Sequence, residues 1–239
     1  MHFYPNPVIA HRGAWKALQY PENSIASLKQ ALLLRCAGSE FDVHMTADEA
    51  LVINHDDHFH GLEIETHTLE ELRRYILSNG EHLPTLKEYL LQGITHNEGT
   101  KMVIEIKPTK VKARGKVVAK KCYDLVDELK ASKWITYISF DLDILTALIS
   151  LNKKVNTQYL NGELSPAVLK SKGITGLDYH YSVFKQHPEW IHEAKENKMV
   201  LNTWTVNAAE AMDYFIRHRF DYITTNEPEL LFERIILNR

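Results

Sequence analysis

The stretch Val8-Ile9-Ala10-His11-Arg12-Gly13-Ala14 is a short apolar run that ends abruptly in an imidazole, a guanidinium and a glycine. Such a run is typical of a buried β-strand. Pro21-Glu22-Asn23-Ser24 follows, and Asn23 or Ser24 is placed to cap a helix that begins at Ile25. The ends of strands that lead into helices are where α/β barrels carry their chemistry. We therefore expect polar residues from later in the chain to converge on this corner.

Further apolar runs divide the rest of the chain into repeated strand and helix units. Strands are predicted to begin near Val8, Gly38, Lys101, Ile135, Lys154, Gly176, Met199 and Tyr222. Helical patterns follow in the second half at Leu142–Ser150, Pro166–Lys172, Pro188–Asn197, Ala208–Arg217 and Pro228–Leu237. The later strand starts lie about 20 residues apart, and eight parallel units of that size close as a (β/α)₈ barrel. We expect an α/β fold, a TIM barrel in a single catalytic domain of residues 1–239, with an open doubly wound sheet as the alternative.

The second strand is expected to carry an extension. The run from Leu51 to Asn54 lies shortly after the strand at Gly38–His44, and the turn Ala47–Ala50 separates the two. This arrangement predicts a short hairpin-like extension of the barrel.

Composition limits the classes of partner. The chain has 239 residues with 28 Lys and Arg against 31 Asp and Glu, a net charge of −3. This balance provides no basic field for nucleic acid or anionic lipid. No apolar run approaches the length of a membrane span, so no stable membrane insertion is expected. The first residues lack a signal-peptide pattern, which predicts a cytoplasmic location unless a leader has been removed. Cys36 and Cys122 are expected to be buried thiols.

Charged and aromatic side chains stand at the predicted strand ends. They are His11, Arg12, Glu40, Asp42, His55, Glu105, Lys107 and Trp204. Glu40 and Asp42 are two residues apart on one strand, so their side chains share a face, and the same spacing relates Glu105 to Lys107. Barrel geometry brings the carboxyl ends of all strands to one rim. Glu22 and Asn23 are interpreted mainly as the entry to the first helix.

Three carboxylates at one rim would repel each other strongly. A divalent cation resolves this repulsion, and an all-oxygen ligand set of Glu40, Asp42 and Glu105 favours Mg²⁺ or Ca²⁺. Arg12 and Lys107 can then bind an anion against the metal. Two imidazoles, His11 and His55, remain as the general base and the general acid, and the sequence does not distinguish which histidine has which role. The set is typical of phosphoryl transfer at a diester.

At these residues the chain resembles the glycerophosphodiester phosphodiesterases. The motifs are His11-Arg12-Gly13, Pro21-Glu22-Asn23-Ser24, Glu40-x-Asp42-Val43, His55-Asp56, Leu83-Pro84-Thr85-Leu86, Glu105-Ile106-Lys107 and Asn202-Thr203-Trp204-Thr205-Val206-Asn207. The resemblance implies a TIM barrel of the phospholipase C-like phosphodiesterase type that hydrolyses glycerophosphodiesters to glycerol 3-phosphate and an alcohol. It implies that Glu40, Asp42 and Glu105 bind the metal and that His11 and His55 perform acid–base catalysis. It also implies that Arg12 and Lys107 contact the phosphate and that Trp204 lies beside the substrate. It also implies a cyclic phosphate intermediate.

Two departures from the family pattern stand out. The segment Asp57–Leu62 replaces an Arg-Thr-Thr-rich stretch on the expected leaving-group side, and Asn226 stands where many members have Asp. We expect Asn226 to serve as a helix cap. Two alternatives stay open: phospholipase D-like action on lysophospholipids, and a barrel that binds a phosphorylated ligand without turnover. The sequence leaves the alcohol and the oligomeric state undefined.

Overall fold

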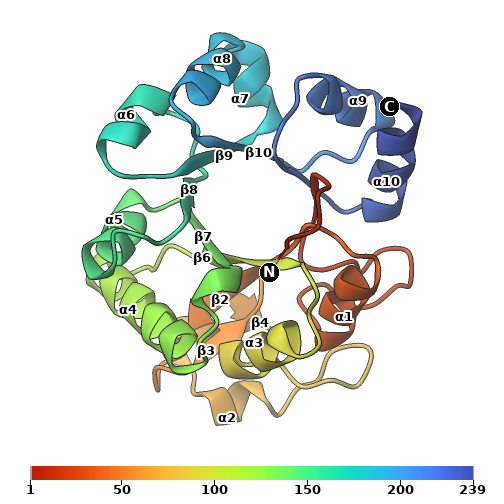
Figure 1. Cartoon of the computed structure of the whole chain (residues 1–239). Coiled ribbons are helices and arrows are strands. Elements are labelled where there is room, and N and C mark those ends of the chain that lie inside the picture. The colour runs from red at the N-terminus through yellow and green to blue at the C-terminus, as the bar shows by residue number, and fades with distance from the viewer. Residues whose placement is uncertain (1, 239) are drawn as a thin grey trace.

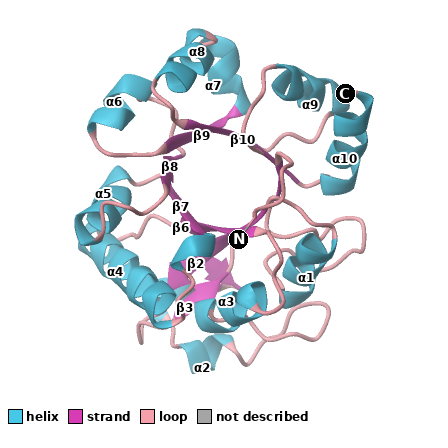
Figure 2. Cartoon of the chain, in the orientation of Figure 1, coloured by secondary structure: helices cyan, strands magenta, loops and turns pink. Residues whose placement is uncertain are grey.

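A parallel barrel forms the centre of the computed structural model, which describes residues 2–238 (Figures 1 and 2). Its strands are β1 (Val8–Ala10), β2 (Gly38–Met45), β6 (Lys101–Ile106), β7 (Ile135–Ser139), β8 (Thr157–Tyr159), β9 (Gly176–His180), β10 (Val200–Trp204) and β11 (Ile223–Thr225). They are hydrogen-bonded in the order β10-β9-β8-β7-β6-β2-β1-β11. Backbone bonds from Tyr222 to Leu201 and from Val206 to Thr224, each 3.0 Å, join β11 back to β10. The predicted (β/α)₈ barrel is thereby confirmed, and the open sheet was the wrong alternative.

Helices surround the barrel on the outside, as Figure 1 shows. They are α1 (Ile25–Leu33), α2 (Leu69–Leu72), α3 (Leu86–Ile94), α4 (Lys112–Glu128), α5 (Leu142–Leu151), α6 (Pro166–Ser171), α7 (Tyr181–Gln186), α8 (Glu189–Glu196), α9 (Ala209–Arg217) and α10 (Pro228–Leu237). Single 3₁₀ turns lie at Ile64–Thr66 and Ser132–Trp134. Each predicted helix of the second half is present within a residue or two of its expected bounds. In the second half only α7 was not predicted; it begins at Tyr181 directly after β9 ends at His180, so no turn residues separate the two elements.

The predicted extension of the second strand is a true hairpin. β3 (Leu51–Ile53) pairs antiparallel with the end of β2, in the register Val43 to Ile53. A further small ribbon, β4 (His58–Phe59) with β5 (Leu62–Glu63), follows it. A second hydrophobic cluster packs beneath these two hairpins; it consists of Val52, Phe59, Ile64, Leu72 and Leu83.

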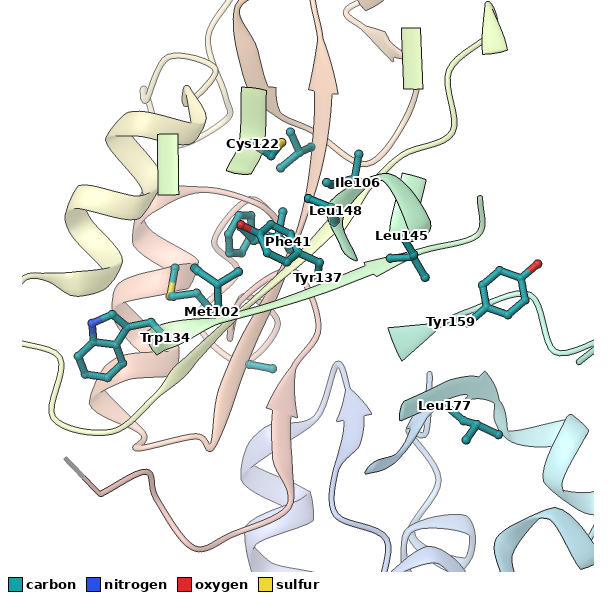
Figure 3. Close-up of a cluster of buried hydrophobic side chains, with 14 of the residues drawn as sticks. Phe41, Met102, Ile106, Cys122, Trp134, Tyr137, Leu145, Leu148, Tyr159 and Leu177 are labelled. Atoms are coloured by element: carbon teal, nitrogen blue, oxygen red, sulfur yellow. The ribbon is translucent and has the colours of Figure 1, made fainter. Parts of the chain in front are cut away.

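The main core lies between the barrel and its helices (Figure 3). Phe41 and Tyr137 point outward from their strands, where they meet Leu148 of α5 and Cys122 of α4. Both cysteines are free and buried, as expected. Because side chains alternate along a strand, the residues between these core positions face the barrel interior. Glu40 and Asp42 flank Phe41 in this way, so the packing that buries Phe41 also directs two carboxylates inward.

Candidate active site

A cavity of about 220 Å³ opens at the carboxyl ends of the barrel strands. Of the predicted site residues, it is lined by His11, Arg12, Glu40, His55, Glu105, Lys107 and Trp204. Asp42 lies just behind this lining with 1% of its surface exposed, and it contacts the lining through Lys107. The structure thus brings together all eight residues that the sequence placed at one rim.

Three buried carboxylates form the centre of the site. Glu40, Asp42 and Glu105 each offer an oxygen, and these oxygens lie within 4.8 Å of one another. Burial, then the charges of Asp42 and Glu105, raises the pKa of Glu40 well above its ordinary value. Burial and Asp42 likewise raise the pKa of Glu105 to about 7. Burial alone would raise the pKa of Asp42 too, but Lys107, His55 and Asn23 lower it to about 2.

The carboxylate cluster fits a hard divalent cation. One oxygen of Glu40, Oε1, is buried without a hydrogen-bond partner among residues 2–238. An unpartnered buried carboxylate oxygen costs free energy unless a cation or donor meets it. The donor set consists of oxygen alone, which suits Mg²⁺ or Ca²⁺ better than a metal that prefers sulfur or imidazole.

Two cationic side chains border the carboxylates. Lys107 Nζ lies 2.9 Å from Asp42 Oδ1 and 2.9 Å from Glu105 Oε1. Burial would lower the pKa of Lys107, but these two carboxylates raise it above its ordinary value. Arg12 donates from Nη1 to Glu22 at 2.7 Å, and its Nε lies 3.6 Å from Asp42 Oδ2. Lys107 is therefore held in its charged form, and the Arg12 guanidinium lies beside it at the cavity.

The turn between β1 and α1 carries Arg12 in an uncommon backbone conformation. Arg12 has φ +56°, and its backbone N–H donates to Glu40 Oε2 at 2.9 Å. Gly13, at φ +79°, passes so close to Ser27 that an added Cβ would lie 2.4 Å from the hydroxyl oxygen. Left-handed backbone at a non-glycine residue costs on the order of 1–3 kcal/mol and is often concentrated at functional sites. Here it turns a backbone donor onto a carboxylate of the cluster.

Asn23 has a role that the sequence did not indicate. It is 3% exposed, its Nδ2 donates to Asp42 Oδ2 at 2.8 Å, and its Oδ1 accepts from the Asp42 backbone at 3.3 Å. The cap of α1 is Ser24, whose side chain accepts from the Ser27 backbone. The expected helix entry is thus confirmed for Ser24, whereas Asn23 holds a carboxylate of the cluster.

Both predicted imidazoles line the cavity. His11 Nδ1 is 2.7 Å from Asn226 Oδ1, and its Nε2 is 3.9 Å from Glu40 Oε2. Burial, then the charge of Arg12, lowers the pKa of His11 to about 4. His55 is half-buried, and its Nδ1 is 2.7 Å from Asp56 Oδ1. The expectation that Asn226 caps a helix was wrong: Glu227 precedes α10 as its cap residue, and the Asn226 side chain contacts His11 instead.

Another part of the cavity wall is largely apolar. It consists of Ile138, Phe140, Leu160 and Trp204, and it contains one acid, Asp178. Trp204 Nε1 donates to the Asp178 backbone oxygen at 2.9 Å. Burial, then Glu105, raises the pKa of Asp178 well above its ordinary value. Sequence reasoning missed Asp178, although it is a carboxylic acid on the strand that was predicted to begin near Gly176.

A barrel rim that joins a carboxylate cluster to two imidazoles and two cations has the groups that a phosphodiester hydrolase needs. The model of the glycerophosphoryl diester phosphodiesterase family matches residues 11–230. The chain belongs to this family and is an enzyme of the glycerophosphodiester phosphodiesterase class, which confirms the resemblance seen in the sequence.

Solved and curated relatives are similar over almost the whole chain. A glycerophosphodiester phosphodiesterase from Parabacteroides distasonis is 40% identical with a TM-score of 0.94, covering 98% of each chain. A glycerophosphodiester phosphodiesterase from Caldanaerobacter subterraneus is 28% identical, over 95% of this chain and 97% of that protein. A phosphodiesterase from Oleispira antarctica, solved with the product sn-glycerol-3-phosphate, shares the fold at 21% identity, with a TM-score of 0.80 and 97% coverage of each chain. Across the described residues, none of the helices combines the length and apolar character needed to cross a bilayer.

Proposed function

We propose that this protein hydrolyses glycerophosphodiesters to glycerol 3-phosphate and an alcohol, with a divalent cation and two histidines. The observation that carries the proposal is the cluster of Glu40, Asp42 and Glu105, whose oxygens lie within 4.8 Å of one another beside His11. A single catalytic domain of residues 1–239 is part of the proposal, because the barrel strands extend from Val8 to Thr225.

Glu40, Asp42 and Glu105 would hold the cation, which is Mg²⁺ or Ca²⁺. When bound, such an ion neutralises charge on the phosphate and draws electron density from its oxygens. Asn23 keeps Asp42 oriented, and the Arg12 backbone N–H keeps Glu40 oriented. Arg12 and Lys107 donate to the non-bridging oxygens, where negative charge develops during the reaction.

The hydrogen bonds of the two histidines support different roles. The amide oxygen of Asn226 can only accept, so His11 Nδ1 carries the proton and its Nε2 offers a lone pair to the cavity. We assign His11 as the general base that removes a proton from the attacking hydroxyl. Asp56 accepts from His55 Nδ1 and orients this ring, and we assign His55 as the general acid that protonates the leaving alcohol.

The attacking group is proposed to be the vicinal hydroxyl of the substrate's own glycerol. An intramolecular nucleophile gains a large effective molarity over water. The product of this first step is a cyclic phosphate, and the roles of His11 and His55 reverse when water opens it. Trp204 provides the apolar face against which the glycerol carbons lie.

Steady-state hydrolysis of glycerophosphocholine, glycerophosphoethanolamine, glycerophosphoglycerol, glycerophosphoinositol and lysophosphatidylcholine tests the proposal. We expect turnover of the glycerophosphodiesters, loss of turnover in EDTA and recovery with Mg²⁺ or Ca²⁺. His11→Ala and His55→Ala should each lower kcat by about 10²- to 10⁴-fold. His192→Ala is the matched control, because this histidine is exposed on α8. Full activity of both site variants, or turnover of the lysolipid alone, would overturn the proposal.

A further inference from the structure

Asp178 is a buried carboxylic acid that the proposed mechanism does not use. It lies on β9 opposite Asn202 of β10, with 1% of its surface exposed. Its Oδ1 has no hydrogen-bond partner within residues 2–238, and none of the ion pairs there includes Asp178. An unpaired carboxyl in such a place destabilises the fold. A fold retains such a group at that cost most readily where a ligand completes it.

Within the described part of the chain, the residues around Asp178 form no hydrogen bond to its Oδ1. Ile138, Phe140 and Leu160 are apolar, and the indole N–H of Trp204 is already bound to the Asp178 backbone oxygen. Neither cation of the site pairs with Asp178 within the described residues: Lys107 contacts Asp42 and Glu105, and Arg12 contacts Glu22 and Asp42. Asp178 is therefore an acid beside mainly apolar side chains, in a cavity lining that also includes the hydroxyls of Thr205 and Thr224.

The cavity is small, which limits the part of the substrate that can reach Asp178. Its volume is about 220 Å³, below the roughly 300–1,000 Å³ typical of pockets for larger ligands. A glycerol unit with its phosphate fits this space better than a whole diester with a large alcohol. With the phosphate held by Arg12 and Lys107, the glycerol unit extends toward the wall that contains Asp178.

We propose that Asp178 binds the terminal hydroxyl of the substrate's glycerol unit and so selects glycerol over alcohols that lack this hydroxyl. The inference rests on the proposed function, and it adds a specificity residue to that site. The vicinal hydroxyl is used in the attack on phosphorus, which leaves the terminal one in need of a partner. A hydroxyl both donates and accepts, so it pairs with a carboxyl in either protonation state.

A pair of matched substrates isolates this contact. One is the diester of glycerol with phosphate and p-nitrophenol, and the other replaces glycerol by propane-1,2-diol. Both keep the vicinal hydroxyl and the leaving group, and only the first has the terminal hydroxyl. A hydrogen bond to a buried carboxyl corresponds to roughly a 10- to 100-fold preference in kcat/KM for the glycerol compound.

Asp178→Leu is the test variant, because leucine has a similar size and suits the apolar wall. We expect it to fold, to turn over the propanediol compound within about threefold of wild type, and to prefer glycerol by less than about threefold. Asp178→Asn should retain the preference, because an amide still pairs with a hydroxyl. One further measurement uses the wild-type protein alone: glycerol 3-phosphate should inhibit its hydrolytic activity more strongly than propane-1,2-diol 1-phosphate does.

The outcomes separate this inference from the proposed function. If wild type hydrolyses neither compound, the proposed function fails and the inference fails with it. If wild type hydrolyses both but shows no preference, or inhibition by the two phosphates is equal, only the role of Asp178 is overturned. The role would also be overturned if Asp178→Leu kept the wild-type preference for the glycerol compound, or if it lost activity equally on both compounds. Either result would mean that Asp178 binds a buried water or supports the fold instead.

Discussion

His11 Nδ1 and Asn226 Oδ1 lie 2.7 Å apart, although 215 positions separate the two residues in the sequence. The barrel brings them together because β1 and β11 are neighbours, and the His11 backbone N–H donates to the Thr225 oxygen at 3.0 Å. The contact fixes which ring nitrogen of His11 carries the proton. It also turns Nε2 toward the carboxylate cluster, 3.9 Å from Glu40 Oε2, where the proposed general base would act.

Asn226→Ala should therefore impair the proposed base without removing it. The His11 ring loses its acceptor, so both its tautomer and its orientation become variable. We expect kcat to fall by about 10- to 100-fold, with KM within about threefold of wild type. Asn226→Asp is the matched control: a carboxylate still accepts from Nδ1, and kcat near neutral pH should stay within about threefold. Equal losses in the two variants would contradict the orienting role.

Cation binding should raise the thermal stability of the protein, because the cation relieves repulsion among three buried carboxylates. At 100 times the dissociation constant a ligand stabilises by about 2.7 kcal/mol, which for this chain length corresponds to roughly 5–10 °C in Tm. Glu40→Gln should reduce the shift to less than about 2 °C. Glu22→Gln should keep it, because Glu22 bonds Arg12 and lies outside the cluster. Differential scanning fluorimetry with Mg²⁺, Ca²⁺ and EDTA measures the shift, and an identical Tm in all three would argue against a cation site.

Asn23 is expected to set metal affinity through Asp42. Its φ of +59° would strain an alanine, so Asn23→Gly is the cleaner variant, because it removes the amide and tolerates the backbone. The metal concentration for half-maximal activity should rise about 10- to 100-fold, since partners of metal ligands contribute that much to affinity. At saturating metal, kcat should stay within about threefold. A lower kcat with unchanged metal dependence would show that Asn23 acts otherwise.

Sequence reasoning succeeded where the position of a residue within its own strand determines the direction of its side chain. Glu40 and Asp42 flank the apolar Phe41 on a strand, so their inward direction followed from alternation alone. The regular spacing of apolar runs then predicted the barrel, and barrel geometry predicted that the side chains at the strand ends share one rim. Trp204 was likewise predictable, because it stands at the end of a strand.

What the sequence could not supply were contacts between residues on different elements. Asn226 looked like a helix cap because it precedes Pro228, and only the neighbouring strand β1 makes it a partner of His11. Asn23 looked like part of a helix entry for the same reason. Asp178 was missed although it lies, like Glu40, on a predicted strand; only the structure shows the apolar side chains that other strands place around it.

Gly13 offers a test of how tightly the β1–α1 turn is built. An added Cβ at Gly13 would meet Ser27 at 2.4 Å and the Ser27 backbone at 2.6 Å, whereas at Gly61 it would meet nothing within 4 Å. Both glycines have a similar left-handed φ, +79° and +81°, so backbone strain is matched and only the contact differs. Gly61→Ala should lower the free energy of unfolding by about 1 kcal/mol; Gly13→Ala should lower it by roughly 2–4 kcal/mol and reduce kcat, because Arg12 moves with the turn. Urea unfolding of both variants measures the difference. Equal losses in the free energy of unfolding would mean that Ser27 moves aside for the added methyl group at no further cost.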